Sequence, residues 1–381
     1  LSLKLKRYYK LFIILLFFIS AFNIPPVAGY LVASMKEKSD WEHQPDDIEQ
    51  AVFKNRPNIY YIQPDGYTNF TNLKDSIHNF DNSDFTAFLA DNNFKVYDKQ
   101  HSNYYSTLLS NSSMFAMKHH YITKDVEVYR ARQVVMEDNA VLRTLKHNKY
   151  KTFFITEKPY FLMNRPDLGY DYCNIPSGDI PFIKDGWSLN YDVFGDLKKV
   201  MSQTEGSGNF FFIEKFTPGH ISVHKNLSKD ELPEEVEKEK KTYLASVKKA
   251  NIWLKEVIIQ IETHDPNAII IIGADHGGFA GLAYSLQSEY KITNRHLINS
   301  IFGSLLAIKW NGERAEGYDT NLKSSVNLFR TVFSVLSQNK GYLDNLQDNS
   351  SYVRLKEPKG LYRYINDKGE IVFENVENVQ N

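Results

Sequence analysis

The sequence predicts an α/β protein in which helices cover both faces of a mostly parallel sheet. The first indication is the run IIIIG at residues 269–273, because a continuous β-branched stretch is typical of a strand buried on both sides. The second is that such strands alternate along the chain with segments of helical periodicity. The third is that several strands end in polar side chains, the place where α/β proteins collect their ligands.

The first half of the chain supplies these elements in order. Within RPNIYYIQPDG, residues 58–63 form an expected strand that Asp65 and Gly66 follow. A helix at 84–93 and a strand through Val96 and Tyr97 come next. The segment TLLSNSSMFAM, 107–117, has apolar residues at helical spacing with small serines opposite, which predicts a helix. A helix at 139–147 and a strand at 151–155 complete this half.

The second half repeats the alternation. Helices are expected at 191–203, 234–262 and 325–337, and strands at 209–215, 268–273 and 304–309. The charges in PEEVEKEKKTYLASVKK alternate in sign, which is typical of a solvated helix face. The tail YRYINDKGEIVFENV predicts a hairpin that turns at 366–369.

The N-terminus predicts a membrane anchor at residues 1–35, followed by a charged stalk at 36–55. Basic residues precede a charge-free stretch at 11–34, a pattern that signal peptides and signal anchors share. An unbroken membrane-spanning helix needs about 20 residues. Pro25 and Pro26 are expected to interrupt the helix of this stretch before it reaches that length. We therefore predict a retained, kinked anchor, with cleavage near Ala28 or Ser34 as the alternative. The chain begins with Leu, so a non-standard start or a truncated product with further spans upstream is expected.

The composition excludes some classes of function and of metal site. The chain of 381 residues carries 45 Lys and Arg against 46 Asp and Glu, so it lacks the basic excess of a nucleic-acid-binding protein, and no nucleic-acid partner is predicted. Cys173 is the one cysteine, which excludes an intrachain disulfide and a Cys-rich zinc site.

Polar residues at the ends of separate elements form a candidate site. Asp65 follows the first strand, Thr107 begins a helix, His220 follows FFFIEKF, and Asp275 and His276 follow the isoleucine run. Carboxylates, an imidazole and a hydroxyl suit a divalent ion such as zinc or manganese, which would also activate the threonine hydroxyl as a nucleophile. The alternative for Asp275 and His276 is a hydrogen-bonded pair in a turn.

These segments resemble the alkaline phosphatase superfamily. Five segments occur in the order found in that family: RPNIYYIQPDGY, NSDFTAFLADNNFKVYDKQHSNYYSTLLSNSSMFA, FFFIEKFTPGHI, GADHGG and SSVNLFRTVF. Their sequences are similar to those of its membrane-anchored sulfatase-like hydrolase/transferase branch. The resemblance implies an alkaline-phosphatase-like three-layer sandwich with a mostly parallel central sheet. It implies a catalytic domain at 56–345, which leaves 346–381 as a C-terminal hairpin extension.

The resemblance also implies roles for single residues. Asp65, Asp275 and His276 match the metal ligands, and Thr107 matches the nucleophile, itself a ligand, with Ser106 and Ser110 as neighbouring alternatives. His220 matches a histidine that assists a metal or contacts the transferred group. The expected metal is zinc, with manganese, magnesium and calcium as alternatives. A further two histidines are candidates for a second metal site or for substrate contacts: His224 and His296.

The departures from the family favour phosphate over sulfate as the transferred group. Sulfatases convert a Cys or Ser in C/S-x-P-x-R to formylglycine, whereas CNIPSG is out of register and Thr107 is followed by Leu-Leu-Ser. The first strand offers one acid, Asp65, where many relatives have two. One firm metal site is therefore expected.

Together these features predict a metal-dependent sulfatase-like hydrolase/transferase. Its expected substrates are phosphate esters of the cell envelope, namely a phosphorylated lipid or a phosphorylated polysaccharide (glycan). Thr107 is expected to attack the phosphate group and form a covalent intermediate. The expected location is a bacterial-type inner or plasma membrane, with the catalytic domain on the extracytoplasmic side. The alternative is a catalytically inactive sulfatase-fold domain that binds an envelope glycan or a partner.

Overall fold

A seven-stranded mixed sheet forms the centre of the protein. The computed structural model describes residues 2–36, 40–75, 77–122, 125–180, 186–204, 206–313 and 315–376. The strands are β1 (Ile59–Pro64), β2 (Lys95–Val96), β3 (Lys151–Thr156), β4 (Tyr172–Cys173), β5 (Asn209–Lys215), β6 (Ile269–Gly273) and β7 (Leu306–Lys309). Their order across the sheet is β2-β7-β6-β1-β5-β3-β4.

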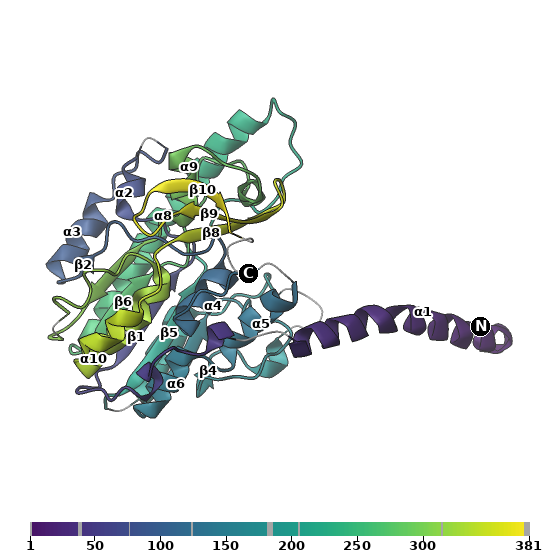
Figure 1. Ribbon diagram of the computed structural model, residues 1–381, viewed down its shortest axis with the longest axis horizontal. Coiled ribbons are helices and arrows are strands. Elements are labelled where there is room, and N and C mark those ends of the chain that lie inside the picture. Colours follow the sequence, from purple (N-terminus) through teal and green to yellow (C-terminus); the bar gives the residue numbers. More distant parts are fainter. Residues whose placement is uncertain are drawn as a thin grey trace.

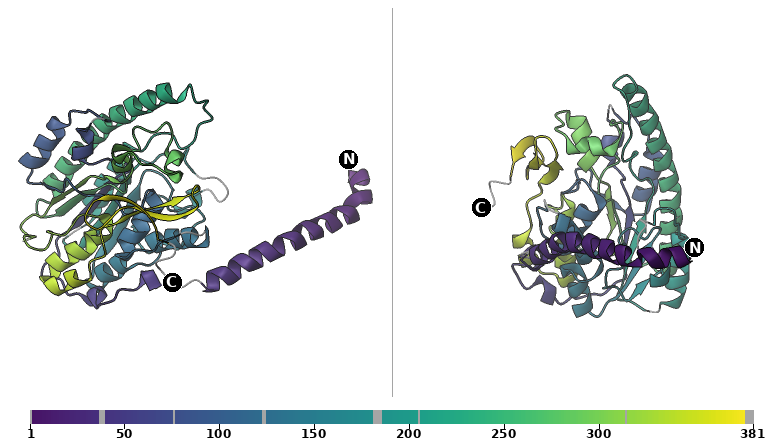
Figure 2. Two further views of the ribbon diagram at one scale, coloured as in Figure 1. Left: turned by 45° about the horizontal axis from the view of Figure 1, so that its top comes forward. Right: turned by 90° about the vertical axis from the view of Figure 1, so that its right-hand side faces the viewer.

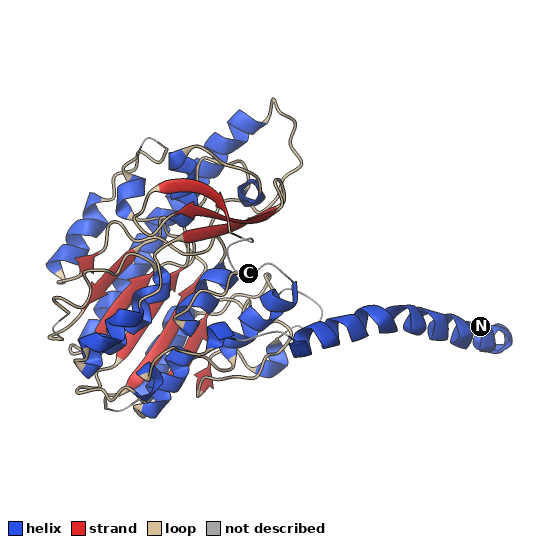
Figure 3. Cartoon of the chain, in the orientation of Figure 1, coloured by secondary structure: helices blue, strands red, loops and turns tan. Residues whose placement is uncertain are grey.

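Most of the strand pairs are parallel. Strands β6, β1, β5, β3 and β4 run in one direction, while at the other edge β7 pairs antiparallel with β6, and β2 pairs antiparallel with β7. The prediction of a mostly parallel sheet is confirmed, and each predicted strand is present with boundaries shifted by at most a few residues. Figure 3 shows the strands in red between blue helices.

Helices cover both faces of this sheet, so the body has three layers (Figures 1 and 2). The helices on one face are α4 (Thr107–Ala116), α5 (Asp125–Met136), α6 (Ala140–His147) and α10 (Leu328–Ser337), which share one hydrophobic cluster. The helices on the other face are α3 (Ser83–Asp91), α7 (Val193–Gln203), α8 (Leu232–His264) and α9 (Arg295–Phe302), with the short α2 (Phe70–Leu73) beside them. The predicted α/β sandwich is confirmed, and α5 is a helix that the sequence reading did not anticipate.

Successive strand residues point to opposite faces and so supply both clusters. Tyr61 of β1 belongs to the cluster under α4, whereas Tyr60 belongs to the cluster under α8. Because β1 and β5 are in register, Tyr60 stacks on Phe211 with ring centroids 4.5 Å apart and Tyr61 stacks on Phe212 at 5.4 Å. Aromatic pairs of this kind contribute about 1 kcal/mol each beyond the area that they bury.

A second, three-stranded antiparallel sheet follows the main domain. It consists of β8 (Ser351–Leu355), β9 (Gly360–Ile365) and β10 (Ile371–Asn375) in the order β10-β9-β8. The predicted hairpin is present between β9 and β10, where the amide of Gly369 donates to the carbonyl of Asn366 at 2.8 Å. Strand β8 was not anticipated, and it joins the main domain where the amide of Tyr352 donates to the carbonyl of Asn103.

The N-terminal helix α1 (Ser2–Lys36) projects away from the body (Figures 1 and 2). It runs without a break through Pro25 and Pro26, so the expected interruption is wrong. The two prolines are adjacent and remove backbone donors from a single turn only, while the turns on either side stay hydrogen-bonded. Within it, Tyr8–Gly29 has a mean hydropathy of 2.3 and side chains exposed to the surroundings, as in a membrane-spanning segment.

Candidate active site

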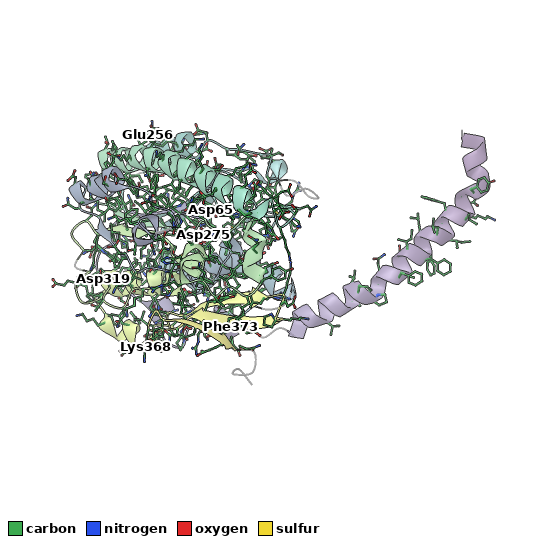
Figure 4. All side chains as sticks on the ribbon, turned by 90° about the horizontal axis from the view of Figure 1, so that it is seen from above. Asp65, Glu256, Asp275, Asp319, Lys368 and Phe373 are labelled. Carbon is green, nitrogen blue, oxygen red and sulfur yellow. The ribbon has the colours of Figure 1, made fainter. Side chains whose placement is uncertain are left out.

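Three neighbouring strands bring the predicted site residues to one edge of the sheet. In the order β6-β1-β5, Asp275 and His276 follow β6, Asp65 follows β1, and His220 lies in the loop after β5. Thr107 is the first residue of α4. Figure 4 shows Asp65 and Asp275 next to each other inside the body, near helix α8. The carboxyl ends of parallel strands are where α/β proteins place their sites.

The hydroxyl of Thr107 lies between two of the predicted metal ligands. Its Oγ1 atom is 3.2 Å from Asp65 Oδ1, to which it donates, and 3.2 Å from His276 Nε2. His276 Nε2 is in turn 3.3 Å from Asp275 Oδ2 and 3.7 Å from Asp65 Oδ1. Residues 65, 107, 275 and 276 thus form one compact, buried cluster.

The donor set fits a divalent cation. Asp65, Asp275 and His276 each offer a ligand atom within 4.8 Å of the others. His276 Nδ1 lies 2.8 Å from the carbonyl of Gly277, so a neutral ring that donates there turns the lone pair of Nε2 towards Asp275 Oδ2. That oxygen is buried and accepts no hydrogen bond from the described residues. Lone pairs that face each other in this way are stabilised by a cation between them.

Backbone contacts hold the three loops together. The amide of Gly66 donates to Asp275 Oδ1 at 3.0 Å, and the amide of Gly219 donates to the carbonyl of Asp65 at 2.8 Å. Gly66 has φ +66°, and a Cβ there would lie 2.5 Å from the carbonyl oxygen of Gly219. Only glycine fits this close approach, which explains the Asp-Gly that ends the first strand.

Burial and nearby negative charges make Asp65 hard to ionise without a cation. Desolvation raises the pKa of Asp65 well above its usual value, and the nearby charges of Asp275 and Glu214 raise it further. Glu214 is itself fully buried in β5, and desolvation raises its pKa well above the usual value although Thr156 donates to it. A bound divalent cation would offset this repulsion.

His220 faces the cluster as a neutral imidazole. Its ring centroid is 5.8 Å from that of His276 and 5.7 Å from that of Phe279. Nδ1 lies 2.6 Å from the carbonyl of Ile221, to which it donates in the neutral ring, leaving the lone pair on Nε2. Desolvation and the neighbouring His276 lower the pKa of His220, which favours this neutral form.

The other candidate residues lie elsewhere. Ser110 donates its hydroxyl to the carbonyl of Tyr104 at 2.8 Å, and Ser106 is the residue before α4. His224 is exposed and stacks on Tyr284 at 5.7 Å, while His296 of α9 lies 3.4 Å from Asp75. Ser110, His224 and His296 therefore have their side-chain partners outside the cluster.

Two residues near the site were missed by the sequence reading. Glu214 carried a signal, because it is an acid that directly follows the apolar run FFFI within strand β5. No sequence signal pointed to Tyr160, since it lies in the long segment after β3. Burial raises the pKa of Tyr160 to about 12, with Asp65, Glu214 and Asp275 adding to the shift, and the Arg132 guanidinium lies 5.7 Å from the centre of its ring.

The comparisons with known proteins are of two kinds. No protein-family model and no curated protein sequence matches the chain. Solved structures do match. The C-terminal periplasmic domain of EptC from Escherichia coli has a TM-score of 0.51 and 14% identity, covering 81% of this chain and 93% of that one.

Two further solved structures have the same fold. The lipooligosaccharide phosphoethanolamine transferase EptA from Neisseria meningitidis, an integral membrane protein, has a TM-score of 0.52 and 13% identity over 76% of this chain and 57% of that one. A sulfatase from Bacteroides thetaiotaomicron, from a locus for glycosaminoglycan metabolism, has a TM-score of 0.51 and 11% identity over 85% and 90% of the two chains. The chain thus shares its fold with these phosphoethanolamine transferases and with this sulfatase, which agrees with the fold that the resemblance of its motifs implied.

Proposed function

We propose that this protein is a metal-dependent, sulfatase-like hydrolase or transferase that acts on phosphate esters through a covalent threonine intermediate. The observation that carries the proposal is the position of Thr107 Oγ1, which is 3.2 Å from both Asp65 Oδ1 and His276 Nε2. A hydroxyl held among metal-ligand atoms at the first residue of a helix has the surroundings of a phosphoryl-transfer nucleophile.

Residues 65, 275 and 276 would hold the cation, with Thr107 beside them. The bound cation would lower the pKa of the threonine hydroxyl and supply positive charge to the phosphoryl oxygens. Zinc is the first candidate, because two carboxylates and an imidazole are common zinc ligands, and manganese, magnesium and calcium are the alternatives.

The chain's own groups account for two displacements at phosphorus. Thr107 Oγ1 forms a bond to phosphorus as the bond to the leaving oxygen breaks; Asp65 Oδ1, the acceptor of its hydrogen bond, takes the hydroxyl proton, and the leaving oxygen departs as an anion that takes a proton from water. Water or an acceptor hydroxyl then displaces Thr107 from phosphorus, and the proton held by Asp65 returns to Thr107 Oγ1. The free Nε2 of His220 is suited to take the proton of that second nucleophile.

Phosphate esters fit this chain better than sulfate esters. A formylglycine would need a Cys or Ser where Thr107 stands, and Cys173, the single cysteine, lies in the separate strand β4. We also propose an extracytoplasmic position beside a bacterial-type inner or plasma membrane, supported by helix α1. Phosphorylated envelope lipids or glycans are then the substrates within reach. The similar EptA, named for its action on lipooligosaccharide, supports this substrate class.

Mass spectrometry of the purified protein after incubation with membrane extract tests the proposal. We expect a phosphorus-containing adduct on Thr107, whose added mass identifies the transferred group, and turnover of a chromogenic phosphate ester. Thr107→Ala should lose the adduct and lower turnover by at least about a thousandfold. Thr144→Ala is the matched control, because Thr144 is a buried helical threonine whose hydroxyl donates to Ala140.

The alternative is a catalytically inactive domain that binds an envelope glycan or a partner. Metal content and turnover separate the two cases. A protein that holds no divalent metal, forms no adduct and turns over no phosphate ester supports the binding domain. An adduct that persists in Thr107→Ala instead contradicts the assigned nucleophile.

A further inference from the structure

Helix α8 presents a row of polar side chains to the loops of the candidate site. Glu239, Tyr243 and Ser246 are spaced i, i+4 and i+7, so they lie on one face of the helix. Glu239 and Tyr243 are both buried. The sequence predicted a solvated charged face for this helix, which most of the alternating charges do form, but Glu239 is an exception, and the sequence did not single out these three residues.

Tyr243 touches both metal-binding loops at once. Its hydroxyl donates to the carbonyl of Gly66 at 2.9 Å and accepts from the amide of Thr68 at 3.0 Å. It thereby satisfies two backbone groups in the turn directly after Asp65. Its ring packs against Gly278, where an added Cβ would lie 2.1 Å from the ring carbons. Gly278 is two residues beyond His276.

Glu239 and Ser246, on the same face of α8, contact the third loop of the site, which follows β5 and contains His220. Glu239 accepts from the amide and from the hydroxyl of Ser222, both at 2.8 Å, and Ser246 donates to the carbonyl of Pro218 at 2.7 Å. These contacts lie on either side of His220. Helix α8 therefore contacts all three loops that contain the candidate site residues after β1, β5 and β6.

We propose that Tyr243 is a positioning residue for the metal site, setting the separation between Asp65 on one loop and Asp275 and His276 on the other. This inference rests on the proposed function. Ligand atoms bind a cation well only when their spacing is fixed, and outer groups that orient ligands typically change metal affinity by about 10- to 100-fold. The amide of Gly66 already links the two loops through Asp275 Oδ1, and Tyr243 adds a second link from the carbonyl of the same glycine to Gly278.

Zinc titration calorimetry on the full-length wild-type and Tyr243→Phe proteins tests this inference. The substitution keeps the ring and removes the hydroxyl that bridges Gly66 and Thr68. We expect the Kd for zinc to rise about tenfold or more. With zinc saturating, we expect kcat to fall while KM for a chromogenic phosphate ester changes by less than about twofold, because Tyr243 is buried and its hydroxyl is bonded to Gly66 and Thr68.

Tyr150→Phe is the matched control. Tyr150 is also buried, and its hydroxyl donates to the carbonyl of Pro57 at 2.8 Å, at the opposite end of β1. Both substitutions should lower the Tm of the metal-free protein to a similar extent, and Tyr150→Phe should leave zinc affinity unchanged. Equal zinc affinity in Tyr243→Phe and wild type overturns the positioning role. A wild-type protein that binds none of zinc, manganese, magnesium and calcium overturns the proposed function, and this inference with it.

Should Tyr243→Phe fail to fold, Gly278→Ala tests the same contact with the hydroxyl retained. Its methyl group would push the Tyr243 ring away from the second loop. The positioning role requires that this variant also bind zinc more weakly while its metal-free Tm shows that it is folded. Unchanged zinc affinity in the folded variant contradicts the role.

Discussion

Thr107 and its neighbours were found in the sequence because each of them stands at the end of a recognisable element. Apolar runs mark β1 and β6, and the acid after each run marks a candidate ligand. Convergence follows from topology, since β6, β1 and β5 are adjacent and parallel. The residues that support the site could not be found in this way. Tyr243 looks like one more apolar position of an amphipathic helix until the loops that it touches are known.

Glu214 provides a prediction at the residue scale. It is fully buried, Thr156 donates to its Oε2 at 2.7 Å, and its Oε1 has no hydrogen-bond partner among the described residues. Its pKa is raised in the folded state, so the folded protein binds the proton more tightly than the unfolded chain does. Stability therefore falls as the pH rises above about 4.5, by at most about 1.4 kcal/mol per pH unit from this group.

Glu214→Gln removes this titration while its amide oxygen can still accept from Thr156. We expect the Tm difference between the variant and wild type, measured with a metal chelator present, to shift in favour of the variant between pH 4 and pH 8. The test is how this Tm difference changes with pH, because the amide group itself does not titrate and affects the Tm equally at every pH. Glu256→Gln, at an exposed position of α8, should show no such change. A parallel pair of Tm curves for Glu214→Gln and wild type would disprove the expectation.

Helices and strands were predicted well where periodicity dominated and poorly where tertiary contacts did. Strand β8 is short and gains its partners from β9 and from Asn103, neither of which its own sequence reveals. Helix α1 passes through Pro25 and Pro26 although intrinsic propensity argues against it. Helix α4, by contrast, begins at Thr107 as its apolar spacing predicts.

His120 links α4 to the N-terminal segment and provides a prediction at the scale of elements. Its ring stacks on Tyr104 at 4.1 Å, meets Trp41 at 5.4 Å, and donates through Nε2 to the carbonyl of Leu109 in α4 at 2.9 Å. Desolvation lowers its pKa from 6.5 to about 3. The unfolded chain therefore binds the proton first, and this group's contribution to stability, full above pH 6.5, is lost as the pH falls towards 3.

His120→Gln should lower the Tm at pH 7, where the stacked ring is lost, and should flatten the decline of the Tm between pH 6.5 and 4. Thermal unfolding across this range measures both effects. His147→Gln is the control, since His147 is exposed at the end of α6. An equally steep decline in His120→Gln and wild type would show that other groups set the acid sensitivity.

The whole molecule consists of a compact three-layer body and one projecting apolar helix. Because α1 extends away from the body while Trp41 is buried within it, we expect a chain that starts at residue 40 to fold on its own. This truncated chain should appear in the soluble fraction with an unchanged Tm, whereas the full-length protein should sediment with membranes. Ultracentrifugation followed by thermal unfolding makes the comparison. A truncated chain that still sediments with membranes would show that the body has its own membrane contact.

The order in which the proposed ligands occur along the chain has a consequence for biosynthesis. Asp65 and Thr107 leave the ribosome early, but Asp275 and His276 come only after most of the sheet has been made, and β6 must insert beside β1 before they reach the others. If the proposed cation binds there, its binding would belong to the last stage of folding, and the bound ion would be found only in fully folded molecules.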